Sequence, residues 1–330
     1  MTKKKALFLE VALIAILLLA AGCGGGTEKK TTAPKFPTKP ISVIVPYGAG
    51  GGTDAIARSM SKAAEPFLGQ PITINNKVGA NGAVGMTDGV NAPADGYTVT
   101  AVAIETVLHP IMGNVKWKVG DYKSILMTNS DPVSVAVRGD SPYKTLDDVI
   151  KAAKANPDTL KLATLAPGAI THLSALAFQD KTGTKFNMVP FPTGGAAAIT
   201  DLLGGHVDVA CITAAEMSQH VKVGKIRLLA IMDGNRMKGF PNVPTAKEQG
   251  FDLAFSVWRG MAVPAKTPDE IVKILHDAFK KAMEDPKFVE FMEKGDYGIR
   301  YDTGANFQKF MENETLLLQP LLDKAGLIKK

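Results

Sequence analysis

A turn of four glycines is the part of this sequence best suited to bind a ligand. Residues 46–53 read PYGAGGGT and join an apolar strand, residues 41–45, directly to a helix predicted to begin at Asp54. Glycine lets the main chain approach a ligand closely. The first amides of a helix have no partner within it, and the positive end of the helix dipole lies there too. The turn therefore predicts a cradle for an anion, formed by Tyr47, Gly48, Ala49, Gly50, Gly51 and Thr53.

Two later loops repeat this design. The strand LKLAT leads into residues 165–170, LAPGAI, and the strand FNMV leads into residues 190–195, PFPTGG, each followed by a predicted helix. Loops at the carboxyl ends of parallel strands border the ligand crevice of an α/β protein. Opposed cradles on two lobes suit a ligand with carboxylates at both ends. The candidates here are Gly168, Ala169, Thr171, His172, Thr193, Gly194 and Gly195.

Three charged side chains near these loops each have two possible roles. Asp54 either caps the helix after the glycine turn or accepts a hydrogen bond from a ligand hydroxyl or ammonium group. Glu105, just past a predicted strand, either accepts such a bond or is a solvated loop charge. Arg259, on another predicted strand, either holds a ligand carboxylate with its planar guanidinium or forms an ion pair. The sequence leaves these alternatives open.

The motifs of nucleotide binding, metal binding and catalysis do not occur. Thr53 replaces the third glycine of a dinucleotide-binding fingerprint, and Asn75 and Asn76 stand where an acidic ribose-binding residue is expected. The Gly-Lys-Ser/Thr of a phosphate-binding P-loop does not follow the turn. The five histidines lack metal-binding spacing, and there is no Gly-x-Ser-x-Gly elbow. We therefore expect no catalytic residues, no metal and no cofactor.

The elements that position these loops follow an α/β pattern. Short β-branched runs alternate with amphipathic runs, which predicts mainly parallel sheets. The predicted strands are 41–45, 71–75, 98–104, 133–137, 160–164, 186–189, 207–212 and 226–231, and the predicted helices are 54–67, 145–155, 171–181, 196–203, 215–221, 268–283, 286–294 and 305–325.

The domain organisation follows from two places where a strand has an exit rich in Gly, Asp or Pro, within residues 130–143 and 226–235. We expect the chain to cross between two lobes there. The predicted first lobe combines residues 40–138 and 229–330, the second is 139–228, and a cleft separates them.

The N-terminal residues are predicted to lie outside the fold. Three lysines, an apolar run and small residues before Cys23 are typical of a lipoprotein signal peptide over residues 1–22, with Cys23 as the lipidated first residue of the mature chain. An ordinary secretory signal with an incidental Cys23 is the alternative. Residues 23–39, rich in Gly, Thr, Lys and Pro, predict a flexible tether. With Cys23 lipidated, only Cys211 remains, so no intramolecular disulfide is available.

The charge balance argues against nucleic acid as a partner. The whole chain has a formal charge of +6, and loss of the three lysines and one glutamate of residues 1–22 leaves +4. No cluster of Lys and Arg is interleaved with aromatic residues, as a groove for a nucleic-acid backbone requires. The modest excess is compatible with an anionic ligand.

Several motifs together resemble one family. PYGAGGGTD, GQPITINNKVGANGAVG, SPYKTLDDVIKAAKANP, DLLGGHVDVA, FPNVPTAKEQGF and WRGMAVPAKTPDEIV resemble the periplasmic substrate-binding proteins of tripartite tricarboxylate transporters, the Bug or TctC family. The resemblance covers nearly the whole mature chain. It implies a two-lobed, type II periplasmic-binding-protein fold that closes like a Venus flytrap on a carboxylated small molecule and delivers it to a membrane permease. It also implies ligand contacts from the glycine turn, including Asp54, and from the two later loops, residues 165–170 and 190–195.

The last of those loops departs from the family pattern. The commoner form has an aromatic residue, a polar residue and then glycine, whereas residues 191–195 here read FPTGG. This loop has neither the tyrosine nor the lysine from which the family pattern implies ligand contacts. Trp258-Arg259-Gly260 resembles the tricarboxylate binders of the family more than its amino-acid binders.

The sequence thus predicts a monomeric, non-enzymatic lipoprotein on the periplasmic side or outer face of a cell membrane. It would capture a small carboxylate, a di- or tricarboxylate such as citrate, for transporter membrane subunits of the tripartite tricarboxylate type. Two alternatives stay open: an exported enzyme acting on an anionic substrate, and a ligand sensor or adhesin on the same fold.

Overall fold

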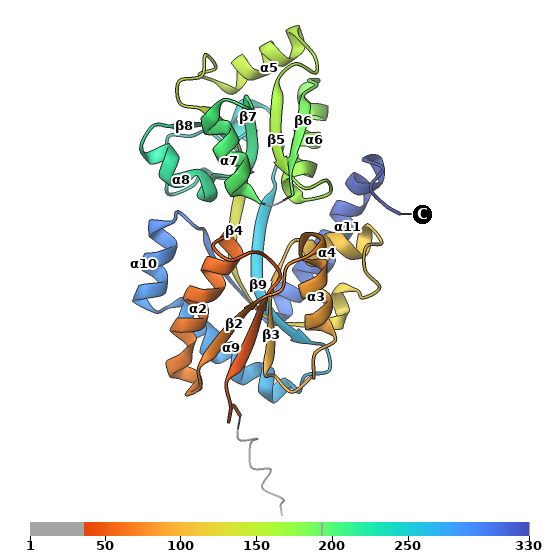
Figure 1. Ribbon diagram of the computed structural model, residues 1–330, viewed down its shortest axis with the longest axis vertical. Coiled ribbons are helices and arrows are strands. Elements are labelled where there is room, and N and C mark those ends of the chain that lie inside the picture. Colours follow the sequence, from red (N-terminus) through yellow and green to blue (C-terminus); the bar gives the residue numbers. More distant parts are fainter. Residues whose placement is uncertain (1–35, 193, 330) are drawn as a thin grey trace, which may run out of the picture. The chain divides into compact units, whose positions relative to one another are not determined.

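A computed structural model describes residues 36–192 and 194–329 (Figure 1). Their strands follow the order β2-β1-β3-β9-β4-β7-β5-β6, and β10 and β8 also pair with β4. The predicted signal peptide, Cys23 and most of the predicted tether lie outside the described residues, as does Thr193.

Sheet A positions the glycine turn. It contains β1 (Ile41–Val45), β2 (Ile72–Asn76), β3 (Thr98–Ala103), β9 (Ser256–Pro264), β10 (Ile299–Thr303) and the first part of β4 (Tyr122–Arg138). Because β1 is parallel to both β2 and β3, the residues after β1 and β3 meet at one edge of the sheet. Its helices are α2 (Gly52–Leu68), α3 (Ala83–Val90), α4 (Glu105–Ile111), α9 (Asp269–Met283), α10 (Pro286–Lys294) and α11 (Gly304–Lys324).

Sheet B carries the two later loops. It contains β5 (Lys161–Leu165), β6 (Asn187–Phe191), β7 (Val209–Thr213), β8 (Ile226–Ile231) and the end of β4. Its helices are α5 (Leu146–Ala155), α6 (Ile170–Thr182), α7 (Gly195–Gly204) and α8 (Ala214–Lys222). Strand β5 is parallel to β6 and β7, so the loops that lead into α6, α7 and α8 gather at one edge.

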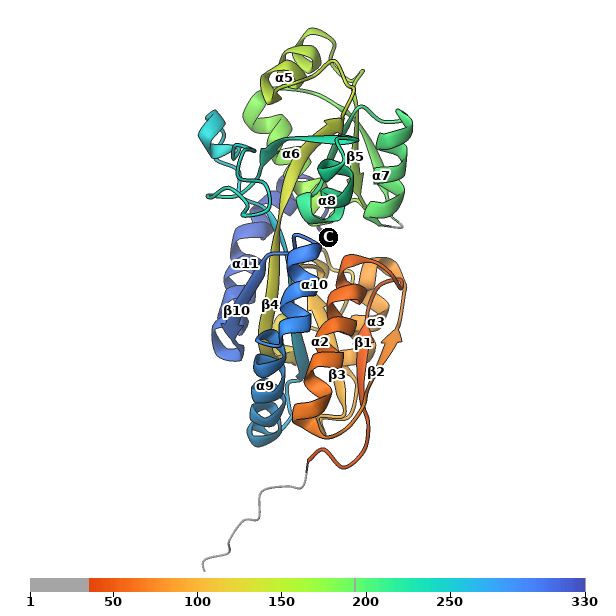
Figure 2. The same ribbon diagram turned by 90° about the vertical axis from the view of Figure 1, so that its left-hand side faces the viewer.

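The long strand β4 belongs to both sheets (Figure 2). Residues 122–132 pair with β9 in sheet A, and residues 133–137 pair with β7 in sheet B. Sequence analysis predicted only the second part, because the polar run TNSDP hides the first from a reading based on strand propensity. All β4 pairings are antiparallel, and among the described residues five of nine strand pairings are antiparallel. The sheets are therefore mixed rather than mainly parallel.

The other predicted elements occur with ends shifted by a few residues, for physical reasons that α2 illustrates. Ile56, Ala57, Met60 and Ala64 recur at helical spacing, and all are buried against sheet A. The helix ends at Gly69, whose left-handed φ of 65° suits glycine at that position. Helices α3 and α4, strand β10 and short 3₁₀ turns at 80–82, 119–121 and 247–249 were not predicted.

The core of sheet B extends beyond residue 228. Met232, Ala246 and Leu253 are buried in the same cluster as strand residues Val135 and Cys211. We propose that the second crossing between the lobes falls nearer residue 255, where β9 is about to begin, than residue 228.

Burial raises the pKa of the Cys211 thiol to about 12, so the prediction that Cys211 is a small buried apolar residue is confirmed.

None of the helices in residues 36–192 and 194–329 combines the length and the apolar character that crossing a membrane requires.

Candidate ligand-binding cleft

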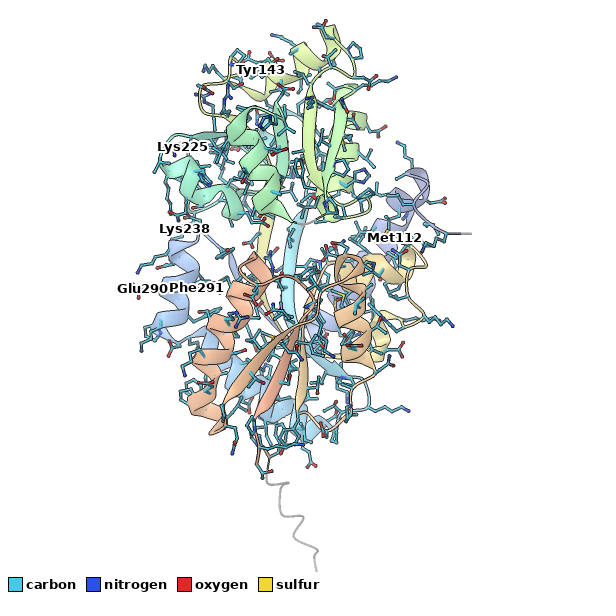
Figure 3. All side chains as sticks on the ribbon, in the orientation of Figure 1. Met112, Tyr143, Lys225, Lys238, Glu290 and Phe291 are labelled. Carbon is cyan, nitrogen blue, oxygen red and sulfur yellow. The ribbon has the colours of Figure 1, made fainter. Side chains whose placement is uncertain are left out.

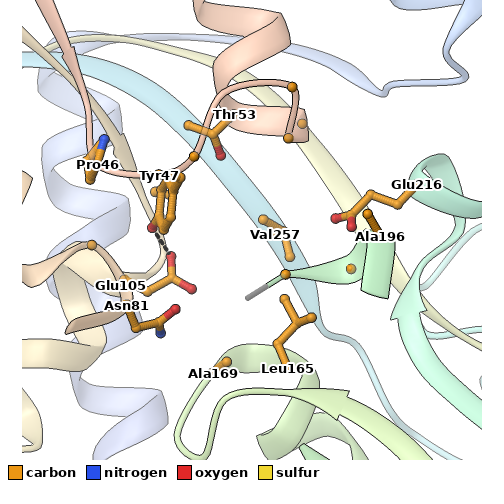
Figure 4. Close-up of a pocket in the computed structure, with 18 of the residues that line it drawn as sticks. Pro46, Tyr47, Thr53, Asn81, Glu105, Leu165, Ala169, Ala196, Glu216 and Val257 are labelled. Carbon is orange, nitrogen blue, oxygen red and sulfur yellow. Dashed lines mark hydrogen bonds between the residues drawn. The ribbon is translucent and has the colours of Figure 1, made fainter. Parts of the chain in front are cut away.

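A cavity of about 860 Å³ is bordered by loops from both sheets. Sheet A contributes residues 46–53, residues 78–82 and Glu105, while sheet B contributes residues at the starts of α6 and α7 and in α8. Val257 of β9 forms part of the wall (Figure 4). Arg259 of the same strand also lines the cavity. The volume lies in the range typical of small-molecule sites.

The structure brings most of the predicted site residues to this cavity. Its lining includes Tyr47, Gly48, Ala49, Gly50, Gly51, Thr53, Glu105, Ala169, Gly194, Gly195 and Arg259. Asp54, Gly168, Thr171 and His172 are not among the lining residues. Whether the lining residues contact a ligand stays a prediction.

The glycine turn offers main-chain donors at the start of α2. Gly51 is the N-cap, and no side chain caps the helix. Among the described residues, no acceptor is recorded for the amides of Gly51, Gly52 or Thr53. The amide of Gly50 differs, because it donates to Asp54 Oδ2 at 2.9 Å. The amides of residues 51–53 are therefore available as donors at the start of α2, whereas the protein itself uses the amide of Gly50.

Asp54 stabilises the glycine turn through hydrogen bonds to its side chain. Its carboxylate accepts hydrogen bonds from the amide of Gly50, from Arg58 Nε at 2.9 Å and from Asn76 Nδ2 at 2.8 Å. The residue is 2% exposed. Burial alone would raise the pKa of Asp54, but hydrogen bonds from Arg58, Gly50 and Asn76 lower it below its usual value. These contacts differ from the helix cap that the sequence suggested, and a ligand contact of Asp54 stays a prediction.

We expect Asp54→Asn to lower the free energy of unfolding by about 2 kcal/mol at pH 7, because hydrogen bonds to a charged group are lost. A folded-state pKa below the unfolded value stabilises the protein above the unfolded pKa, and this contribution disappears as pH falls through the folded pKa. The difference between wild type and variant in urea unfolding should therefore shrink below about pH 4. Asp147→Asn, on an exposed α5 pair with Lys151, is the control and should change little. Equal effects of both variants would contradict the stabilising role of Asp54.

Arg259 places a buried positive charge beside the cradle. It lies on β9 and is 4% exposed. Its Nε donates to Thr53 Oγ1 at 2.9 Å, and its Nη1 donates to Asp131 Oδ2 at 2.7 Å. A Cβ on Gly52 would lie 3.1 Å from Nη2, so glycine gives the guanidinium room at the start of α2. Burial alone would lower the pKa of Arg259, but Asp131 and Glu216 raise it, so the side chain stays charged.

Asp131 holds the arginine in place, and sequence analysis missed it. The carboxylate is fully buried and also accepts from Asn129 Nδ2 at 2.8 Å and from the amide of Gly298 at 2.9 Å. The available signal was an acidic residue between the apolar residues 125–127 and the predicted strand 133–137, because a buried charge requires a partner. The ion pair predicted as one alternative for Arg259 is therefore present, and Arg259 also lines the cavity.

Tyr47 and Glu105 form another part of the cavity wall. The Tyr47 hydroxyl donates to Glu105 Oε2 at 2.6 Å (Figure 4). Burial and the adjacent Glu105 carboxylate raise the pKa of Tyr47 well above its usual value, so the tyrosine remains a donor at neutral pH. Glu105 is 8% exposed in the first turn of α4, so it is not the solvated loop charge considered from the sequence.

Three predicted residues of the first sheet-B loop shape that loop rather than line the cavity. The Thr171 hydroxyl accepts from the amide of Leu165 at 3.0 Å and is buried. The amide of Gly168 donates to His172 Nδ1 at 3.3 Å, and burial lowers the pKa of His172. Gly168 has a φ of 82°, and a Cβ there would lie 2.5 Å from Met112 Sδ.

Several lining residues were not predicted: Asn81, Glu216, Gln219 and Tyr297. Glu216 had no clear sequence signal, because Thr213-Ala214-Ala215-Glu216 reads as a helix-capping motif.

Two α/β sheets that share strand β4, with helix N-termini and loops around a cavity between them, define a two-lobed solute-binding protein. The model of the tripartite tricarboxylate transporter family receptor, TctC, matches residues 56–327. The chain belongs to this family, and the resemblance drawn from the sequence motifs is confirmed.

Individual relatives agree with this assignment. A UPF0065 protein of Cupriavidus necator is 34% identical over 325 residues, which is 98% of each chain. A TctC solute-binding protein from Polaromonas is 37% identical with a TM-score of 0.73, and the match covers 88% of this chain and 99% of that one. MatC from Rhodopseudomonas palustris, solved with bound malate, is 25% identical with a TM-score of 0.79, covering 87% of this chain and 100% of that one. The protein therefore has a periplasmic-binding-protein fold.

Proposed function

We propose that this protein is an extracytoplasmic solute-binding lipoprotein that captures a small carboxylate, a di- or tricarboxylate such as citrate. The main support for this proposal is the group of main-chain amides at the start of α2, for which no acceptor is recorded among the described residues. These amides lie beside the buried guanidinium of Arg259. Amide donors, a helix N-terminus and a guanidinium together favour carboxylate oxygens. The bound malate in MatC supports this ligand class.

The same proposal includes delivery of the ligand to membrane subunits of a tripartite tricarboxylate-type transporter, with no chemical conversion. Membership of the receptor family supports that partner. We further propose that Cys23 carries a lipid anchor after removal of residues 1–22. The protein would then work on the periplasmic side or outer face of the membrane. Closure of the two lobes over the ligand is the motion expected of this fold.

A thermal-shift screen of the purified protein against di- and tricarboxylates tests the proposal. A ligand present at 100 times its dissociation constant should stabilise the protein by about 2.7 kcal/mol. Incubation of each stabilising compound with the protein, followed by analysis of the compound, tests for turnover. Absence of any stabilising carboxylate, or conversion of a carboxylate by the protein, would contradict the proposal.

We expect Gly50→Val to weaken carboxylate binding about tenfold or more. Gly50 has a φ of 84°, where a side chain costs roughly 1–2 kcal/mol, and its amide fixes the turn to Asp54. Relaxation of the turn would displace the donors of Gly51 and Gly52. Gly224→Val is the matched control, because Gly224 has a φ of 72° in open space and does not line the cavity. Calorimetric titration should show weaker binding only for Gly50→Val, and unchanged binding in that variant would count against the cradle.

A further inference from the structure

Glu216 is part of a helix-capping motif in the sequence but does not make the capping hydrogen bond. In a capping box, a Thr caps a helix and an acidic residue three positions later bonds back to the amide of the Thr. Thr145 and Asp148 make both of these bonds, and so do Thr245 and Glu248. Thr213 and Glu216 have the same spacing but make neither, because α8 has no side-chain cap.

The carboxylate of Glu216 instead points into the cavity (Figure 4). Thr213 Oγ1 donates to Glu216 Oε1 at 3.1 Å and so fixes the orientation of the group. Among the described residues, no donor to Oε2 is recorded. A Cβ on Gly195 would lie 1.9 Å from Oε2, so only glycine leaves room for this carboxylate beside the start of α7.

This carboxylate is one of the acidic groups that line the cavity. The acidic and basic side chains among its described lining residues are Arg259, Glu105 and Glu216. Asp131 already neutralises Arg259. Glu105 and Glu216 each accept a hydrogen bond at one carboxylate oxygen, from Tyr47 and Thr213 respectively. Burial raises the pKa of Glu216, and Arg259 offsets this only in part. A ligand made only of carboxylates would satisfy the amides and Arg259 but would offer no hydrogen-bond donor to Oε2 of Glu216.

We propose that Glu216 determines specificity by accepting a hydrogen bond from a hydroxyl or ammonium substituent of the ligand. The cleft would then select carboxylates that carry such a donor over unsubstituted ones of the same length. This inference rests on the proposed function, since it names a subclass of the same ligands. The physical reason is that a partly buried acceptor without a donor costs free energy, which a substituted ligand recovers.

Matched ligands that differ in one substituent provide the test. Succinate, malate and aspartate share two carboxylates and a four-carbon chain, and tricarballylate and citrate differ by one hydroxyl. We expect at least one of the two series to bind. Within that series, calorimetric titration of the purified protein should give a dissociation constant at least about tenfold lower for the hydroxyl- or ammonium-substituted ligand than for the unsubstituted one. Tighter binding of aspartate than of malate assigns the donor as ammonium, and the reverse assigns it as hydroxyl.

Variants of Glu216 connect the preference to this residue. Glu216→Gln should reduce the ratio between substituted and unsubstituted ligands to about threefold or less, and Glu216→Asp, which keeps the charge, should retain part of it. Thr213→Val removes only the hydroxyl that orients Oε1 and should also reduce the ratio. Glu290→Gln is the matched control, because Glu290 lies on α10, pairs with Lys294 at the surface and does not line the cavity (Figure 3).

The outcomes separate the two levels of the argument. Equal affinity for substituted and unsubstituted ligands, or an unchanged ratio in Glu216→Gln, would overturn the role of Glu216 while the carboxylate-binding function stands. Binding of no carboxylate in either series would overturn both.

Discussion

Replacing Asp131 with alanine is expected to lower the free energy of unfolding by about 3–5 kcal/mol, the largest stability effect among the changes considered. Asp131 is fully buried, and its partner Arg259 has a side chain only 5% exposed. Removal of the carboxylate leaves the guanidinium with an uncompensated charge in the interior. The amide of Gly298 and the side chain of Asn129 lose their acceptor as well. Urea unfolding at neutral pH measures the difference.

Two controls identify the buried charge as the cause. Asp269→Ala removes an ion pair with Lys123 in which the acidic side chain is 95% exposed, so stability should change little. The double variant Asp131→Leu with Arg259→Met removes both charges, and apolar replacement of a buried pair is often neutral. It should therefore regain most of the lost stability. A single Asp131→Ala variant as stable as the wild type would contradict this account.

The elements that sequence analysis identified are those whose own residues determine their structure. Helix α2 has an apolar stripe and a terminal glycine, and β1 is a short β-branched run, so local patterns suffice. Helix α3 contains two glycines, and α4 contains Pro110, so their intrinsic helix propensity is low and tertiary packing stabilises them. The first part of β4 was missed for a related reason, because its buried Asn129 and Asp131 are unusual in a strand.

The candidate site shows a similar division between local and long-range information. The glycine turn and its amides are contiguous in the sequence, so their role as an anion cradle could be predicted. The pair between Asp131 and Arg259 joins residues 128 positions apart, and it depends on the register in which Asn129 faces Arg259 across β4 and β9. Glu216 was hidden by its capping motif, since only the structure shows that its carboxylate faces the cavity. Charges that meet through tertiary packing therefore determine the parts of the site that the sequence did not reveal.

Replacing Arg259 is expected to have the largest effect on binding. A guanidinium that donates two hydrogen bonds to a carboxylate contributes about 1.5–3 kcal/mol for each, so its loss should weaken binding at least about 100-fold. Arg259→Met alone would leave Asp131 unpaired and confuse stability with affinity. The double variant Asp131→Leu with Arg259→Met avoids this problem, because it removes the Asp131 carboxylate together with its guanidinium partner. Calorimetric titration of this variant with the carboxylate that stabilises the wild type measures the effect.

Arg300→Met is the matched control for this experiment. Arg300 is exposed, lies over the ring of Phe310 and does not line the cavity, so its removal should leave the affinity unchanged. Arg259→Lys provides a second comparison, because lysine keeps the charge but cannot donate to Thr53, to Asp131 and to a ligand in one plane. Its affinity should fall between those of the wild type and the double variant. Retention of wild-type affinity by a folded double variant would show that the main-chain amides of α2 hold the carboxylate without the arginine. Arg259 would then have only the structural role of joining β9 to β4 through Asp131.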